Sequence, residues 1–146
     1  MAEYHQFDFW IGTWDVFTTG KDNQVAISIV ESLYGSCVLR ENWQPIAGAP
    51  GGSLNSFDRV SRIWRQTWAD ASGNWVEFTG GISGTAMILN GNWREMNGSG
   101  KDVLTRMTYS RGAEGFVRQL GEQSLDNGKT WTPSFDFTYR PRPKLP

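Results

Sequence analysis

Residues 7–16 of the chain have the sequence FDFWIGTWDV, which joins a short helical pattern to the first of many strand-like segments. Within residues 4–11, Phe7 and Trp10 recur at helical spacing, and Gly12 is of the residue type that commonly ends a helix. A run rich in β-branched and aromatic residues follows directly. We therefore expect a short N-terminal helix that plugs one end of a structure built from strands.

Strand-like segments recur about every 8–12 residues along the whole chain. We predict strands over residues 13–19, 25–34, 37–44, 53–58, 62–70, 74–80, 85–90, 102–110, 115–124 and 134–140. Their connections contain glycine, asparagine and aspartate, which suit tight hairpins, so successive strands should be antiparallel neighbours. Closure would remove the exposed edges of such a sheet. The predicted fold is all-β, an antiparallel up-and-down barrel of about ten strands with a lumen wide enough for a cavity.

The composition excludes several classes of function. The 14 basic and 15 acidic residues leave a formal charge of -1, without the positive excess that binds nucleic acid or an anionic membrane. The single cysteine, Cys37, excludes an internal disulfide and a cysteine-built metal site. The single histidine, His5, excludes zinc motifs of the HExxH type. We therefore expect no metal, no cofactor, no nucleic acid and no membrane partner.

The length of 146 residues is that of one domain, residues 1–146. Residues 1–12 are expected to close the barrel, and the proline-rich tail, residues 141–146, should not continue a strand because proline lacks the N–H donor. The longest irregular connection is expected over residues 45–53, where a flexible loop could rim a binding site. The first residues lack the basic region of a targeting signal, which together with the lone cysteine predicts a cytoplasmic protein.

Alternate residues of a strand face opposite sides of a sheet, so each predicted strand can be tested for its lumen-facing set. In residues 37–43 the more apolar set is Cys37, Leu39, Glu41 and Trp43. Glu41 would then lie between a leucine and a tryptophan. A carboxylate there must be paired, multiply hydrogen-bonded, or raised in pKa by desolvation.

The same test places further side chains from three other strands in the lumen. They are Asn55, Trp64, Gln66, Trp68, Met107 and Tyr109. We group Gln66 with Glu41 as a candidate catalytic residue. The other five side chains, together with Trp43, form the expected ligand-binding set. Indoles beside a few amide and carboxyl groups suit a flat aromatic or isoprenoid-like molecule with one or two polar groups.

Two charged residues have alternative positions relative to Glu41. In residues 115–124 the set containing Arg118 is slightly more apolar than its alternate, which places Arg118 in the lumen as the partner of Glu41; the alternative is the solvent face. An odd residue in the preceding hairpin would place Glu31 opposite Glu41, giving two carboxylates for acid and base work. A symmetric turn, which we favour, instead places Val30 opposite Glu41 and turns Glu31 outward.

Residues 124–131 match the pattern SxDxGxTW, which resembles the Asp-box hairpin of sialidase-type propellers. In those proteins the aspartate ties down backbone amides in a structural turn. A propeller needs several copies of the motif, and this chain has one. We therefore interpret it as a well-formed hairpin.

Gly12-Thr13-Trp14, after an aromatic helix and before about ten strands, resembles the GxW motif that begins the first strand of lipocalin-type (calycin) barrels. The chain also resembles a family of small bacterial proteins of unassigned function. The segments that carry this resemblance are FDFWIGTWDV, Glu41-Asn42-Trp43, Gly52-Ser53-Leu54-Asn55, Trp64-Arg65-Gln66-Thr67-Trp68 and SxDxGxTW. The lipocalin resemblance implies a ligand cavity and a late arginine, Arg140 or Arg142, stacked over Trp14. Nitrobindin-like haem proteins share the architecture but take their iron ligand from a late histidine, which this chain lacks, so we expect no haem.

Two functions from different classes fit these features. The first is binding of a small hydrophobic or aromatic molecule in the lumen. The second is a cofactor-free enzyme of the isomerase, lyase or cyclase type, with Glu41 as general acid or base and with Arg118 and Gln66 stabilising an oxyanion. A structural or dimer-forming module is the third reading, if side chains fill the lumen. The expected partner is a small-molecule ligand or substrate, with a homodimer left open.

Overall fold

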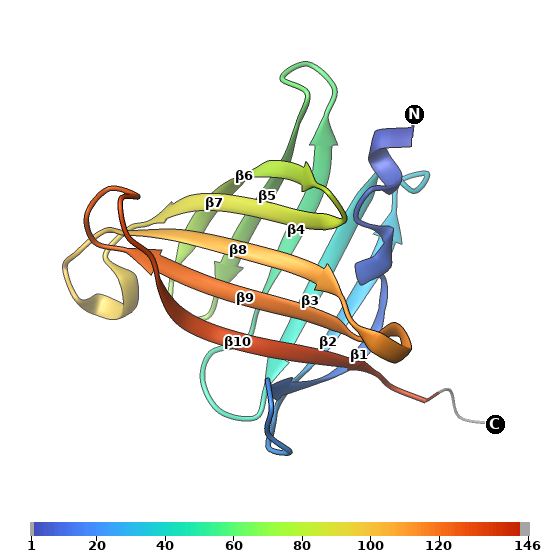
Figure 1. Cartoon of the computed structure of the whole chain (residues 1–146), viewed down its shortest axis with the longest axis horizontal. Helices are drawn as coiled ribbons and strands as arrows, with labels where there is room; N and C mark the ends of the chain where they lie inside the picture. The colour runs from blue at the N-terminus through green and yellow to red at the C-terminus, as the bar shows by residue number, and fades with distance from the viewer. Residues whose placement is uncertain (1, 144–146) are drawn as a thin grey trace.

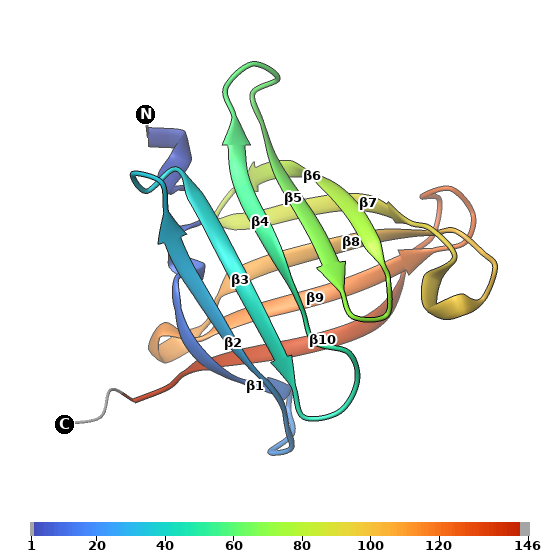
Figure 2. The same ribbon diagram turned by 180° about the vertical axis from the view of Figure 1, so that it is seen from behind.

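Ten antiparallel strands curl into a closed barrel in the computed structural model, which describes residues 2–143 apart from the side chain of Asn97 (Figure 1 and Figure 2). The strands are β1 (Gly12–Thr18), β2 (Gln24–Leu33), β3 (Val38–Pro45), β4 (Gly51–Asp58), β5 (Ile63–Asp70), β6 (Trp75–Ser83), β7 (Ala86–Trp93), β8 (Val103–Arg111), β9 (Val117–Ser124) and β10 (Thr132–Pro141). Each pairs with its neighbour in sequence, and β1 pairs with β10. This topology confirms the predicted fold class and is consistent with a calycin-like architecture.

The strand bounds differ from the predicted ones by no more than three residues. The loop expected over residues 45–53 is shorter, because Gly51 and Gly52 belong to β4. A Cβ on Gly52 would lie 2.6 Å from the carbonyl oxygen of Glu41, so glycine is what allows β4 to approach β3 at this position.

The N-terminal segment consists of two short 3₁₀ helices, η1 (Ala2–His5) and η2 (Asp8–Trp10), where we expected one helix over residues 4–11. Side chains three residues apart eclipse in 3₁₀ geometry. The rings of Phe7 and Trp10 accordingly stack, with centroids 4.8 Å apart and planes 16° apart, and both are fully buried. The tighter winding therefore turns both rings toward the barrel.

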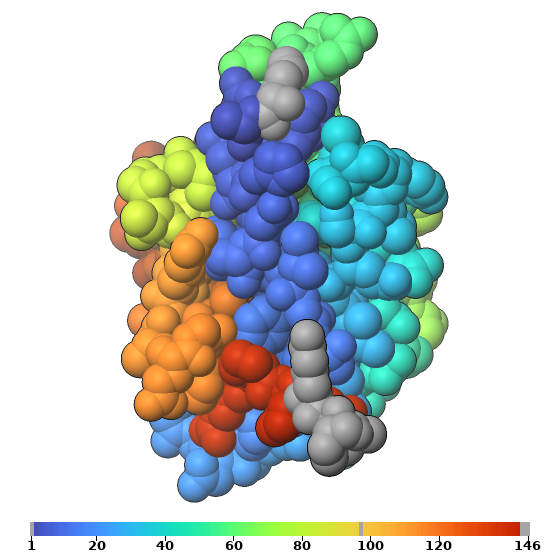
Figure 3. Space-filling view, turned by 90° about the vertical axis from the view of Figure 1, so that its right-hand side faces the viewer, coloured from blue at the N-terminus to red at the C-terminus, as the bar shows by residue number. Residues whose placement is uncertain are grey.

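This segment covers one end of the barrel, as Figure 3 shows from outside. Phe7 and Trp10 contact Tyr109 on β8, with ring centroids 4.9 and 5.0 Å away. The indole nitrogen of Trp14, at the start of β1, donates to the backbone oxygen of Trp10 at 2.9 Å. The prediction that the N-terminal segment plugs one end is confirmed.

The late arginines do not stack over Trp14 as the lipocalin resemblance implies. Arg140 lies on the outer face with its guanidinium 3.9 Å from the ring centre of Phe17, and Arg142 donates to Asp15 at 3.2 Å. Trp14 is buried on the opposite side of β1. Strand β10 continues to Pro141, which is the first residue of the predicted tail. Residues 144–146 of that tail lie outside the described residues.

The hairpin between β2 and β3 settles the position of Glu31. Val30 is the register partner of Glu41, whereas Glu31 pairs with Arg40, to which it also forms an ion pair on the outer face. The symmetric turn that we favour is therefore confirmed, and Glu41 has no second carboxylate across the strand pair.

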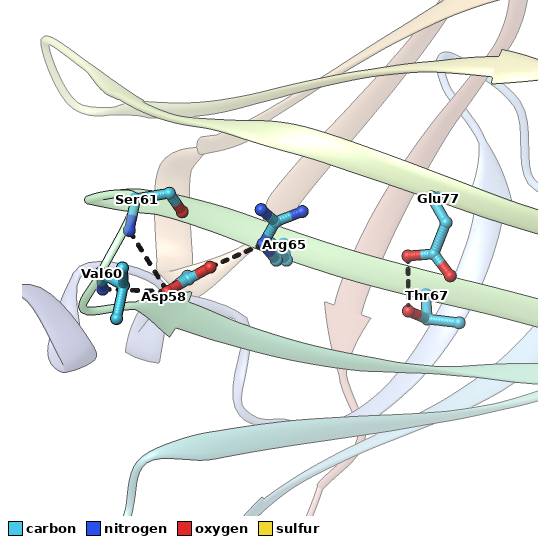
Figure 4. A network of polar contacts seen from close by, with 6 residues as sticks. All are labelled: Asp58, Val60, Ser61, Arg65, Thr67 and Glu77. Carbon is cyan, nitrogen blue, oxygen red and sulfur yellow. Dashed lines mark hydrogen bonds and ion pairs between the residues drawn. The ribbon is translucent and has the colours of Figure 1, made fainter.

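Polar groups stabilise the outer face and its turns. Figure 4 shows Asp58 at the β4–β5 turn, where its carboxylate accepts the backbone N–H of Val60 at 2.9 Å and the guanidinium of Arg65 at 2.9 Å. These donors hold the pKa of Asp58 well below its ordinary value. Farther along β5, the Thr67 hydroxyl donates to Glu77 on β6 at 2.8 Å.

The SxDxGxTW segment forms the β9–β10 hairpin, as predicted. The Ser124 hydroxyl accepts the N–H of Gly128 at 2.8 Å, and Asp126 accepts the N–H of Thr130 at 2.8 Å. The hydroxyl and N–H of Thr130 lower the pKa of Asp126 to about 2. The motif is therefore a structural turn here.

Two further 3₁₀ turns occupy connections, η3 (Met96–Gly98) between β7 and β8 and η4 (Ala113–Gly115) between β8 and β9. Across residues 2–143, no helix is long and apolar enough to cross a bilayer.

Replacing Trp10 by alanine should lower the free energy of unfolding by about 3–5 kcal/mol, because the change leaves a large cavity under a fully buried ring. Chemical denaturation measures this loss. Trp75→Ala is the matched control, since 61% of that tryptophan is exposed on the outer face. Equal losses in the two variants would show that η2 does not close the core.

Candidate functional site

The lumen contains a cavity of about 250 Å³. Its outer part is lined by partly exposed aromatic rings near the strand ends that lie away from the N-terminal segment: Trp43, Trp68, Trp93, Phe135 and Phe137. Its floor carries buried polar side chains: Glu41, Gln66, Tyr109, Gln119 and Tyr139. Phe78 and Met107 complete the wall. An aromatic mouth thus leads to a polar floor above the N-terminal plug.

Lumen-facing glycines make room for the rings of this wall. A Cβ on Gly91 would lie 2.7 Å from the ring of its register partner Phe78. A Cβ on Gly121 would lie 2.2 Å from the ring of Phe135, its partner on β10. Each ring packs on the glycine of the neighbouring strand. The aromatic side chains therefore lie flat against the barrel wall, and the centre of the lumen stays open.

Glu41 lies at the floor and is 6% exposed. Its Oε2 accepts the Ser28 hydroxyl at 2.8 Å and is 3.4 Å from the hydroxyl of Tyr139, while Ser53 on β4 is its third hydroxyl neighbour. Burial is the largest influence on the group and raises its pKa to about 7, although the three hydroxyls oppose the shift. Glu41 therefore titrates near neutrality, and none of its partners among residues 2–143 is charged.

A hydrogen-bonded chain runs from Glu41 across the floor. The Tyr139 hydroxyl donates to Oε1 of Gln119 at 2.7 Å, and Nε2 of Gln119 donates to the Tyr109 hydroxyl at 2.9 Å. Gln66 donates from its Nε2 to the same hydroxyl at 3.3 Å and to Asn55 at 2.6 Å. Two amides thus donate to the Tyr109 oxygen. Burial raises the pKa of Tyr109 above its ordinary value, so it stays protonated at neutral pH.

The prediction that Arg118 faces the lumen and pairs with Glu41 is wrong. Arg118 lies on the outer face, where it binds Asp136 with an Nε to Oδ1 distance of 2.9 Å. On β9 the side chain that faces the floor is instead that of Gln119. The sequence did not predict this, because Gly121 makes the set of Gln119 less apolar than the set of Arg118. Alternation in β10 could have shown the orientation of Arg118. Phe135 and Phe137 face inward, so Asp136 between them faces outward, where it binds the Arg118 guanidinium.

The structure brings most of the other predicted site residues to the cavity. Glu41, Trp43, Gln66, Trp68, Met107 and Tyr109 line it. Asn55 lies behind Gln66, and Trp64 packs instead against the plug, where its indole donates to Gln6 at 3.0 Å. The lining residues that sequence reasoning missed are Phe78, Trp93, Gln119, Phe135, Phe137 and Tyr139. Alternation within 134–140, which has three aromatic residues at every second position, could have found the last three.

His5 lies outside the lumen, on the N-terminal segment, where its Nδ1 is 2.8 Å from Asp8. Within the part of the chain that the structure describes, no three histidine, cysteine, aspartate or glutamate side chains gather as a metal site would require.

The fold and cavity define a class of protein, a closed ten-stranded antiparallel barrel with an aromatic lumen over a polar floor. No family model matches the sequence, and no curated protein matches it significantly.

Burial of Glu41 predicts a pH dependence of stability. Its pKa of about 7 in the folded state exceeds the ordinary 4.5, so the native protein binds more protons than the unfolded chain between these values. The free energy of unfolding should therefore fall as pH rises from about 4.5 to about 7, by about 3 kcal/mol in total.

Denaturation of the wild type and Glu41→Gln across pH 4.5–8 measures this contribution, which the variant should lack. Glu31→Gln on the outer face is the control and should keep the slope. The same slope in the wild type and Glu41→Gln would contradict the assignment.

Proposed function

We propose that the barrel binds a small, flat aromatic molecule that carries one polar group. The observation that supports this most strongly is the combination of an aromatic mouth with hydrogen-bonding groups at the closed end of the same cavity. Such a cavity orients a ligand: its ring system lies among the indoles, and its polar group reaches the floor.

The aromatic contacts favour a planar ligand. Trp43 lies 5.5 Å from Phe137 between ring centroids, and Phe135 stacks on Phe137 at 5.2 Å with planes 28° apart. Rings held against one another present fixed faces, so a ligand that stacks on them loses little additional side-chain entropy. The volume of about 250 Å³ lies below the usual range for drug-sized ligands, which favours a bicyclic or tricyclic ring system.

The polar floor sets the second requirement. In its neutral form Glu41 leaves a floor without a net charge, and among the described lining residues there is no lysine, arginine or histidine to hold an anion. The ligand's polar group is therefore an uncharged carbonyl, hydroxyl or N–H. We also propose that the chain is a calycin-like ligand-binding barrel, which its ten-stranded closure and short N-terminal helical segment support. A filled-core structural module is disfavoured, since the lumen is open.

Chromone, a planar bicyclic ketone, should bind and quench tryptophan fluorescence. Trp43→Ala should weaken binding about tenfold, because it removes one stacking face of the mouth. Trp75→Ala, which removes an exposed indole of the outer face, is the matched control. Native mass spectrometry of freshly purified protein tests independently whether a small molecule is retained. Equal affinity in both variants would place the ligand outside the lumen.

Proton transfer by Glu41 is a second candidate function. Among the described residues Glu41 is the only carboxyl that lines the cavity, and a pKa of about 7 is well matched to acid and base work at neutral pH. Tyr109 lies on the same floor, and its hydroxyl hydrogen can stabilise an oxyanion as Glu41 takes up the proton and becomes neutral, the role that the sequence predicts for Arg118. Gln66 supports this only indirectly, because its Nε2 already donates to Asn55 and to Tyr109. The chemistry that fits is proton abstraction next to a carbonyl, as in isomerisation, elimination or cyclisation.

Exchange of the α-protons of 2-tetralone for deuterium, followed by proton NMR, tests this second function. The protein should accelerate exchange, with a rate that rises as pH increases through about 7 because the ionised Glu41 is the base. Glu41→Gln should reduce the acceleration by about 10²–10⁴-fold, and Glu31→Gln should not. Exchange at the parent rate in Glu41→Gln would exclude Glu41 as the base.

A further inference from the structure

We propose that the Tyr139–Gln119 pair relays the protonation state of Glu41 to Tyr109, so that the lumen prefers a carbonyl-type ligand when Glu41 is neutral and an N–H or O–H ligand when it is ionised. The inference rests on the proposed binding of aromatic ligands in the lumen and specifies which polar group the floor accepts at a given pH.

The first step is the single hydrogen of the Tyr139 hydroxyl. It has two acceptors within reach, Gln119 Oε1 at 2.7 Å and Glu41 Oε2 at 3.4 Å, and it can satisfy only one of them well. In the observed arrangement the short bond goes to Gln119. A neutral Glu41 fits this arrangement, because its carboxyl can donate to the free lone pair of the Tyr139 oxygen while still accepting from Ser28.

The second step is the orientation of the Gln119 amide. Since its oxygen accepts from Tyr139, its nitrogen faces the Tyr109 hydroxyl at 2.9 Å. Gln66 also directs its nitrogen to this hydroxyl, at 3.3 Å. Tyr109 therefore accepts two N–H groups and cannot donate to either of them. Its remaining protein acceptor is the sulfur of Met107 at 3.8 Å, which is a weak one. The hydroxyl hydrogen is left for a ligand acceptor in the cavity.

Ionisation of Glu41 reverses each of these bonds. A carboxylate is a stronger acceptor than an amide oxygen, so the Tyr139 hydrogen turns to Glu41. Gln119 then presents its nitrogen to Tyr139 and its oxygen to Tyr109, a half-turn of an amide that keeps its shape. The Tyr109 hydrogen goes to Gln119, and the tyrosine offers the ligand a lone pair in place of a hydrogen.

Among the residues that the structure describes, the neighbours of Glu41 include no histidine, cysteine or second carboxyl group. Ser28 and Val30 face it from β2, Ser53 from β4 and Tyr139 from β10. Tyr109 on β8 is the other ionisable group of the floor, and burial raises the pKa of both tyrosines above the ordinary value. The ion pair between Glu31 and Arg40 lies on the outer face of the barrel. Between pH 5.5 and 8.5, Glu41 is therefore the group that drives the relay.

Chromone, which only accepts hydrogen bonds, and indole, which donates through its N–H, are matched bicyclic probes, and neither titrates in this range. Calorimetry at pH 5.5 and 8.5 should show chromone binding about fivefold more tightly at the lower pH and indole about fivefold more tightly at the higher pH. Tyr139→Phe breaks the relay while keeping the ring, so both affinities should become independent of pH. Glu31→Gln should retain the opposite trends.

The side-chain ¹⁵N resonance of Gln119, assigned by its loss in Gln119→Glu, gives a readout without ligand. It should titrate with an apparent pKa near that of Glu41 in the wild type and stay constant in Tyr139→Phe and Glu41→Gln. A resonance that does not titrate, or probes that follow the same pH trend, would overturn the relay. Titration of Gln119 without binding of either probe would overturn the proposed ligand binding and leave the relay intact.

Discussion

The pairing of β1 with β10 is the constraint on which the rest of the structure depends. Val16 and Tyr139 face each other across this seam and both point into the lumen. Closure of ten strands removes every sheet edge, but it also creates an interior wider than two facing rows of side chains can fill. One end is therefore filled from outside, by Phe7 and Trp10 of the N-terminal segment, and the remaining space becomes the cavity.

Burial of Glu41 without a counter-charge determines the chemistry of that cavity. A carboxylate inside a barrel is costly, and hydroxyls from β2, β4 and β10 offset part of the cost. Within the described part of the chain, no cation lies beside this carboxylate. The result is a group that changes charge near neutral pH and is linked through Tyr139 and Gln119 to the centre of the floor. A cationic partner would instead have held the acid permanently ionised, and the floor would have had a single state.

Local chemistry made much of the architecture predictable. Positive-φ residues in the turns, strand-like runs and alternation place all ten strands, and alternation alone puts Glu41 and Gln66 inside. Alternation failed where the lumen contains glycine: Gly121 faces inward because Phe135 on the next strand occupies its space. Alternation within a single strand cannot detect that a ring on the neighbouring strand fills the space over a glycine. For this reason the sequence predicts the wrong face for Arg118. Trp64 was assigned to the correct face but not to the correct depth, since alternation carries no information about height along the barrel axis.

The amino-acid sequence by itself determined the all-β class, the antiparallel connections, the plugging segment and the inward position of Glu41. These features follow from interactions between residues close in the chain and from two-residue periodicity. Only the tertiary structure decided that Gln119 rather than Arg118 joins the floor, and that the aromatic rings line an open cavity. Both depend on how rings from separate strands share one interior volume, and that packing exists only once the barrel has closed.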